Sequence, residues 1–129
     1  MTIDIAAVRR NLQARADRER AEREIRRAAA ERAVTEAARR VAPNFSAVTR
    51  IFLFGSVTRD NAFRPDSDVD VAIEGLGTAD YFSIWRAIEE AAPDWTIDVR
   101  DITQPSAFAD RVRSTGKLIY ERVNPTAQG

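Results

Sequence analysis

Three aspartates on two predicted strands are the residues of this sequence best suited to chemistry. Asp68 and Asp70 fall in the segment Asp68–Glu74, where valine and isoleucine take the alternate positions. Side chains alternate across a strand, so both aspartates are expected on one face. Carboxylates this close repel each other, and a divalent cation such as magnesium removes that cost. The pattern therefore indicates a metal site, although alternating Asp and Val is also common on a solvated strand face.

Asp98 interrupts the predicted strand Trp95–Ile102, between Ile97 and Val99. Aspartate is unfavourable in mid-strand, so its presence needs a reason. If this strand lies beside Asp68–Glu74, Asp98 completes a cluster of three carboxylates. Such a cluster can hold two metal ions about 4 Å apart, an arrangement that stabilises both the attacking and the leaving oxygen in phosphoryl transfer.

A glycine–serine turn follows the predicted strand Ala47–Phe54. Gly55 would let backbone N–H groups approach an anion closely, and a helix starting there would add its positive dipole end. The Ser56 hydroxyl can donate to a phosphate oxygen, and Arg59 could reach the same phosphates or hold the loop. Taken alone the signal is weak, because strands often end in glycine simply to turn.

The composition removes several other chemistries. The chain has neither cysteine nor histidine, which excludes thiolate nucleophiles, thiolate metal sites and imidazole bases. It carries 20 basic and 20 acidic residues, and no basic stretch lies near the aspartates, which argues against nucleic-acid binding. Neither a membrane-length apolar run nor an export signal is visible, so a cytoplasmic location is expected.

Strands alternate with helices around these residues, which favours an α/β or α+β domain with a small mixed sheet of three to four strands. The region from Asp4 to Val41 has helical periodicity, with Ile5, Val8, Leu12 and Ile25 among its apolar positions. One long helix or two shorter ones would fit it, and we expect one face on the core.

Two more helices are predicted, one from Thr78 to about Ala92 and one opening at Ser106. In the first, Phe82, Trp85 and Ile88 are expected in the core. The short apolar run Lys117–Tyr120 predicts an edge strand.

The combination of the glycine–serine turn with the three aspartates resembles the nucleotidyltransferase superfamily that includes DNA polymerase beta, the CCA-adding enzymes and kanamycin nucleotidyltransferase. The stretch LFGSVTRDNAFRPDSDVDVAI is most similar to the minimal nucleotidyltransferases, or MNT proteins, and the ending RVRSTGKLIYE is similar to their C-terminal segment. The resemblance implies a polymerase beta-like fold in three parts. Residues 1–42 would be an Arg-rich helical extension packed on the domain, residues 43–123 the nucleotidyltransferase domain, and residues 124–129 a disordered tail.

The resemblance also implies a role for each motif residue. Gly55 and Ser56 would bind the triphosphate. Asp68, Asp70 and Asp98 would be the catalytic residues and the ligands of two magnesium ions, with Asp98 helping to deprotonate the acceptor.

Arg59 matches a family arginine beside the phosphate loop. The next residue departs from the family, which usually has glycine where this chain has Asp60.

The implied activity is transfer of a nucleoside monophosphate, AMP in particular, from ATP or another nucleoside triphosphate to a hydroxyl. Minimal family members typically act as antitoxins beside a HEPN-domain partner, so the expected acceptor is a tyrosine of such a toxin. Two alternatives stay open: a binding module that masks a toxin without catalysis, and a small-molecule nucleotidyltransferase acting on an antibiotic. A homo-oligomer is compatible with each.

Overall fold

The structure, a computed structural model, describes residues 2–123, and the predicted disordered tail lies outside the described residues. Seven main elements follow one another: α1 (Ile5–Val41), β1 (Arg50–Phe54), β2 (Val69–Glu74), α2 (Tyr81–Ala91), β3 (Ile97–Asp101), α3 (Ala107–Thr115) and β4 (Lys117–Glu121). Three single 3-10 turns join them: η1 (Ala42–Asn44), η2 (Gly55–Thr58) and η3 (Thr78–Asp80). The predicted α+β class, the long N-terminal helix and the fourth strand are confirmed.

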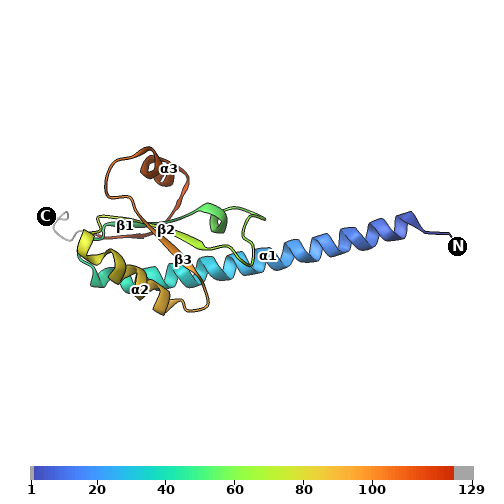
Figure 1. Cartoon of the computed structure of the whole chain (residues 1–129), viewed down its shortest axis with the longest axis horizontal. Helices are drawn as coiled ribbons and strands as arrows, with labels where there is room; N and C mark the ends of the chain where they lie inside the picture. Colours follow the sequence, from blue (N-terminus) through green and yellow to red (C-terminus); the bar gives the residue numbers. More distant parts are fainter. Residues whose placement is uncertain (1, 124–129) are drawn as a thin grey trace.

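The four strands form one mixed sheet in the order β3-β2-β1-β4. Strand β1 runs antiparallel to both β2 and β4, whereas β2 and β3 are parallel. A parallel pair needs a crossover connection, and α2 supplies it. Helices α1 and α2 cover one face of the sheet and α3 lies on the other (Figure 1).

The main core lies between the sheet and the α1–α2 layer. Strand β2 alternates as the sequence predicts, with Val69, Val71 and Ile73 fully buried on this face. They pack with residues such as Val34 of α1 and Ile84 of α2.

A smaller cluster on the opposite face joins α3 to Phe52, Ala72 and Ile102. Phe54 is the next residue of β1 on this face after Phe52, and it is only half-buried. The end of the sheet at Phe54 is therefore open to solvent.

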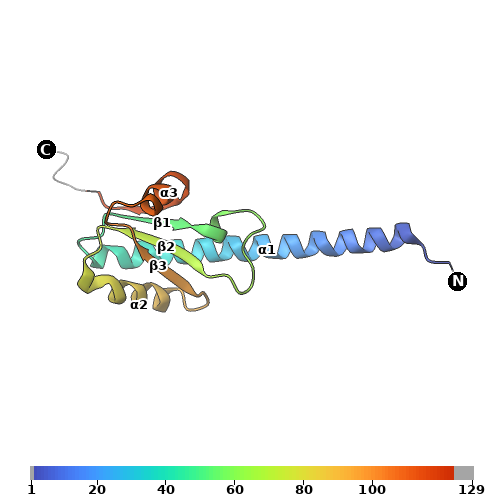
Figure 2. The same cartoon turned by 45° about the horizontal axis from the view of Figure 1, so that its top comes forward.

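Helix α1 is one continuous helix, and it extends well past the sheet (Figure 2). Its buried residues all lie between Ala30 and Val41. The predicted core-facing positions Ile5, Val8, Leu12 and Ile25 are instead 63%, 46%, 60% and 71% exposed. The periodicity identified the helix correctly, but a helix of 37 residues is about 55 Å long and outruns the small sheet that could cover it. Across the described residues, no helix is long and apolar enough to cross a membrane.

Phe82 is a second correction. Ile88 is buried, and Trp85 packs against the core while its indole N–H donates to the Ile97 carbonyl at 2.9 Å. Phe82, predicted to join them, is 75% exposed. Ile84 and Ile88 set the inward face of α2, and a residue two positions from Ile84 points to the other side of a helix.

Candidate active site

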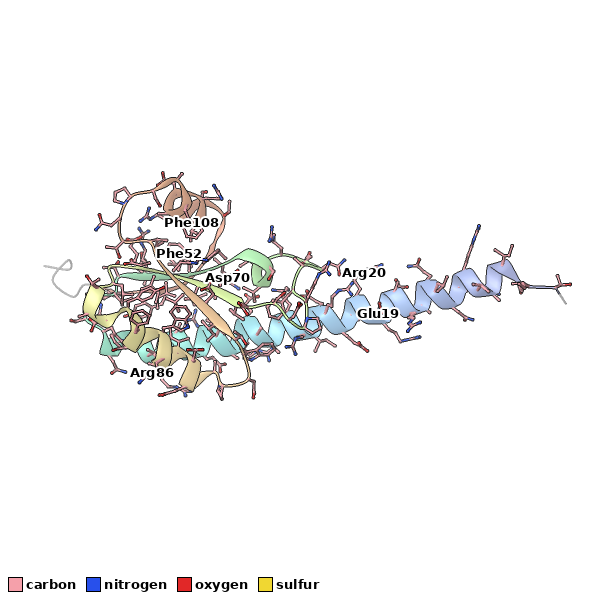
Figure 3. All side chains as sticks on the ribbon, in the orientation of Figure 1. Glu19, Arg20, Phe52, Asp70, Arg86 and Phe108 are labelled. Atoms are coloured by element: carbon pink, nitrogen blue, oxygen red, sulfur yellow. The ribbon has the colours of Figure 1, made fainter. Side chains whose placement is uncertain are left out.

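The register of the parallel pair places Asp70 of β2 directly beside Asp98 of β3. Their chain neighbours Val69, Val71 and Ile97 are buried in the main core, so the alternation turns both aspartates to the face that carries α3. Both are half-buried. Figure 3 labels Asp70 on the sheet, with Phe108 of α3 on the same side. The two carboxylates therefore share one open end of the sheet.

Asp68 lies one residue before β2 and is exposed, although the sequence predicts it inside the strand. Its charge still reaches the site. The pKa of Asp70 is raised to about 6, first by burial and then by the negative charges of Asp98 and Asp68, with a partial offset from Arg100 and Arg59. When neighbouring negative charges raise the pKa of a carboxyl group, a bound cation would stabilise its ionised form.

The side chains as they lie do not form a ready metal cage. Between residues 2 and 123, no group of three or more acidic side chains is arranged to hold a metal ion. Asp98 is instead paired with Arg100, whose Nε lies 3.2 Å from Oδ2. The Arg100 side chain is 61% exposed, and such a pair contributes less than about 1 kcal/mol. Asp98 can exchange it at little cost, and an all-carboxylate donor set fits magnesium.

Gly55 brings the turn against Asp70. Its φ is +74°, a left-handed conformation, and a Cβ atom there would lie 2.3 Å from Asp70 Oδ2. Only glycine allows this approach. The Thr58 hydroxyl donates to the Gly55 carbonyl at 2.7 Å and closes the turn. The expected helix start is a single 3-10 turn of four residues. Ser56 within it is half-buried, and Arg59 just after it is exposed.

Two arginines of α1 hydrogen-bond to the segment between Gly55 and Asp68. This contact is not among those predicted from the sequence. Arg27 Nη1 donates to the Val57 carbonyl at 2.9 Å, and Arg23 donates twice to Asn61 Oδ1 at 3.0 and 2.8 Å. Asn61 has a φ of 62°, a left-handed conformation that asparagine tolerates. The signal was present, since Arg27 falls on the same helix face as the buried Ala30 and Val34.

Phe108 of α3 borders two cavities on the face of the sheet that carries the aspartates. One, of about 550 Å³, is bordered by Gly55, Arg59 and Arg111. The other, of about 460 Å³, is bordered by Phe82 and Arg100. The first cavity reaches the site through Gly55, which lies against Asp70, and the second through Arg100, which pairs with Asp98.

Comparison with known protein families adds one match. The model of the family described as polymerase beta, nucleotidyltransferase matches residues 36–124. None of the curated proteins matches the chain. The family match spans the sheet, the glycine–serine turn and all three aspartates.

Solved structures share the fold. A toxin–antitoxin crystal structure with AMP-PNP aligns at a TM-score of 0.56 with 20% identity, covering 68% of this chain and 73% of that one. A mutant of the toxin–antitoxin MntA–HpeT aligns at 0.55 with 17% identity and the same coverages. A complex of the tri-AMPylated Shewanella oneidensis HEPN toxin with its MNT antitoxin aligns at 0.51 with 19% identity, covering 69% and 71%.

Proposed function

This chain belongs to the polymerase beta nucleotidyltransferase family, and from that premise we propose that it transfers AMP from ATP to a hydroxyl group of a HEPN-type toxin. The observation that carries the proposal is the placement of Asp70 beside Asp98, with the Gly55 turn against them. Two of the structural neighbours support the finer points. One contains AMP-PNP, and another pairs an AMPylated HEPN toxin with an MNT antitoxin.

In this proposal Asp68, Asp70 and Asp98 hold two magnesium ions. Magnesium would neutralise the phosphates and the charge that develops during transfer. Asp70 would bind magnesium in its ionised form, above pH 6. Burial and like charges raise its pKa, and a bound cation would offset both effects. Asp98 would release Arg100 to do the same.

The transfer itself is an in-line displacement at the α-phosphorus. The acceptor oxygen bonds to that phosphorus, the bond to the bridging oxygen of the β-phosphate breaks, and pyrophosphate leaves. The proton of the acceptor hydroxyl passes to the carboxylate of Asp98, because a chain without histidine has no imidazole to take it. The Ser56 hydroxyl and the backbone of Gly55 bind phosphate oxygens, so that positioning supplies much of the rate.

A protein acceptor fits the surface around the site. Phe82 and Phe108 are 75% and 37% exposed, and both border the 460 Å³ cavity beside Arg100. Exposed aromatic side chains next to a reactive centre are typical of protein contacts. The projecting part of α1, with Ile5, Val8 and Leu12 exposed, would add a second docking surface for the toxin.

The test is transfer of labelled AMP to a HEPN-type toxin protein. With magnesium and ATP, the wild-type protein should label the toxin, whereas Asp70→Asn and Asp68→Asn should lower the rate by about 100-fold or more. Asp94→Asn, an exposed change in the loop between α2 and β3, is the matched control and should label normally. Equal labelling by wild type and Asp68→Asn would make the assignment wrong.

A second function, masking of the toxin by contact alone, is favoured by one observation. The apolar residues of the projecting helix have no cover within the described chain. A protein with all three aspartates changed to asparagine separates the two functions. Full neutralisation of the toxin by this variant would favour masking, and loss of neutralisation would favour catalysis.

A further inference from the structure

The larger cavity beside Phe108 is bordered by two guanidinium groups from different parts of the fold. Arg59 follows the Gly55 turn, and Arg111 comes from α3. Both side chains are exposed. Within residues 2–123, neither guanidinium makes an ion pair or a hydrogen bond to the protein. Thr58 and Thr115 add hydroxyl groups to the same wall.

The orientation of α3 turns Arg111 toward this cavity, and contacts of Arg113 fix that orientation. Arg113 pairs with Glu74 at 3.0 Å and donates to the Ile102 carbonyl at 3.0 Å. These contacts fix the helix on the sheet. The cavity-lining residues Phe108, Arg111, Val112 and Thr115 follow the three- and four-residue spacing of one helix face. Arg111 is therefore held toward the Gly55 turn by the fold.

Two cations facing one cavity repel each other unless an anion joins them. Gly55 borders the cavity and also lies against Asp70, where an added Cβ atom would be 2.3 Å from Oδ2, so the cavity extends from the turn beside this carboxylate toward α3. An anion with charge spread along its length fits this shape. Guanidinium groups bind phosphate through two parallel hydrogen bonds, which gives them an advantage over other cations.

We propose that this cavity receives the β- and γ-phosphates of the nucleoside triphosphate, and that Arg111 binds them together with Arg59. The proposal rests on the proposed function for the identity of the nucleotide. It adds a phosphate ligand from α3, outside the glycine–serine turn and the aspartates. It also makes Arg111 a determinant of specificity, because a monophosphate would not reach it.

The test compares three ligands in magnesium buffer by calorimetry: ATP, AMP and inorganic pyrophosphate. Arg111→Gln should weaken the binding of ATP and of pyrophosphate about tenfold, the usual effect of losing one charge-assisted hydrogen bond, and should change AMP binding by less than about twofold. Arg86→Gln is the matched control, since Arg86 lies on α2 across the sheet from Phe108 and should leave all three affinities unchanged (Figure 3). Arg111→Lys should bind pyrophosphate with intermediate affinity, because it keeps the charge and loses the fork.

Unchanged binding of ATP and pyrophosphate by Arg111→Gln would overturn the proposal, as would an equal loss for ATP and AMP. Thermal unfolding of each variant shows whether the fold is kept. The two proposals fail separately. If the wild type labels a toxin while Arg111→Gln binds ATP normally, only this inference is wrong. If pyrophosphate binding depends on Arg111 but no acceptor is ever labelled, only the proposed transfer is wrong.

Discussion

Asp70 is the acidic residue whose ionisation the fold opposes most clearly. Burial, together with the negative charges of Asp98 and Asp68, raises its pKa from 3.8 to about 6. A carboxyl group with a raised folded-state pKa stabilises the protein fully below its unfolded value. That contribution is lost as the pH rises through about 6. Without a divalent metal, the ionised carboxylate is thus a liability at neutral pH.

We therefore expect Asp70→Asn to stabilise the metal-free protein at pH 8. The side chain is half-buried and water screens part of the repulsion, so the gain should be about 1–2 kcal/mol. At pH 4 the gain should disappear, because the wild-type carboxyl group is then largely protonated. Urea unfolding with a chelator at both pH values measures the difference. A gain of the same size at pH 4 and pH 8 would contradict this explanation.

Gly55 and Gly77 form a matched pair for the turn. Gly55→Ala forces a Cβ atom onto Asp70 Oδ2 at a positive φ, whereas a Cβ atom at Gly77 meets nothing within 4 Å. The first change should cost about 1–3 kcal/mol and weaken ATP binding, and the second should be nearly neutral. Unfolding and calorimetry on both variants check this. Comparable losses in the two would show that close approach is not the reason for Gly55.

The sequence predicts the position of these residues where alternating buried residues determine which face of a strand they occupy. Asp70 and Asp98 could be predicted as neighbours because each alternates with buried valine or isoleucine, and buried faces set the register of two strands. The pairing of Asp98 with Arg100 could not be predicted, since the choice of an exposed partner depends on side-chain geometry. The cavity position of Arg111 likewise depends on how α3 is anchored on the sheet.

The contact between α1 and the loop after β1 is the main relation between elements that supports the site. Arg27 donates to Val57, Glu24 and Glu31 at 2.9, 2.8 and 2.7 Å. Its hydrogen bonds to Glu24 and Glu31 raise its pKa still further above the ordinary range. Arg27 therefore holds the turn through the Val57 carbonyl oxygen and leaves Gly55 and Ser56 free to bind phosphate.

Arg27→Met should lower the free energy of unfolding by about 1–3 kcal/mol, because the Val57 carbonyl and Glu31 lose a charged donor. It should also weaken ATP binding, since the turn that carries Gly55 becomes less well fixed. Arg32→Met, an exposed change on the same helix, is the control for the loss of one positive charge. If both variants bind ATP as the wild type does, α1 does not position the turn.

Element boundaries show where periodicity succeeds and where it stops. The predicted strand Ala47–Phe54 begins at Arg50 in the structure, because Ser46 and Ala47 form a turn before it. The apolar character of Phe82 predicts a core position, but Ile84 and Ile88 occupy the inward face of α2. The spacing of apolar residues identifies a helix, but the packing of the whole domain determines which of them are buried.

The molecule divides into a packed part and a projecting part. Deleting residues 2–20 should change the free energy of unfolding by less than about 0.5 kcal/mol, because no residue in this range is buried. Extending the deletion to residue 30 should cost several times more, since it removes Arg23, Arg27 and the fully buried Ala30. Chemical unfolding of both truncated proteins gives the comparison. A large loss from the shorter deletion would mean that the projecting part supports the fold.

The shorter deletion is also the right form of the protein for testing toxin docking, because it leaves the site intact. Loss of toxin capture with unchanged stability would place the docking surface on the projecting part. Unchanged capture would place it elsewhere. The division into residues 1–42 and 43–123 remains a prediction, and the contacts from Arg23 onward tie the end of the helix to the domain.

A helix that is packed over only its last third has a gradient of local stability along its length. Its backbone bonds near Val41 open only when the whole domain unfolds, whereas those near Ile5 depend on helix propensity alone. Amide protons should therefore exchange with solvent progressively faster toward the N-terminus. A binding partner that covered Ile5, Val8 and Leu12 would slow exchange there first, and the slowing would record where along the helix the partner sits.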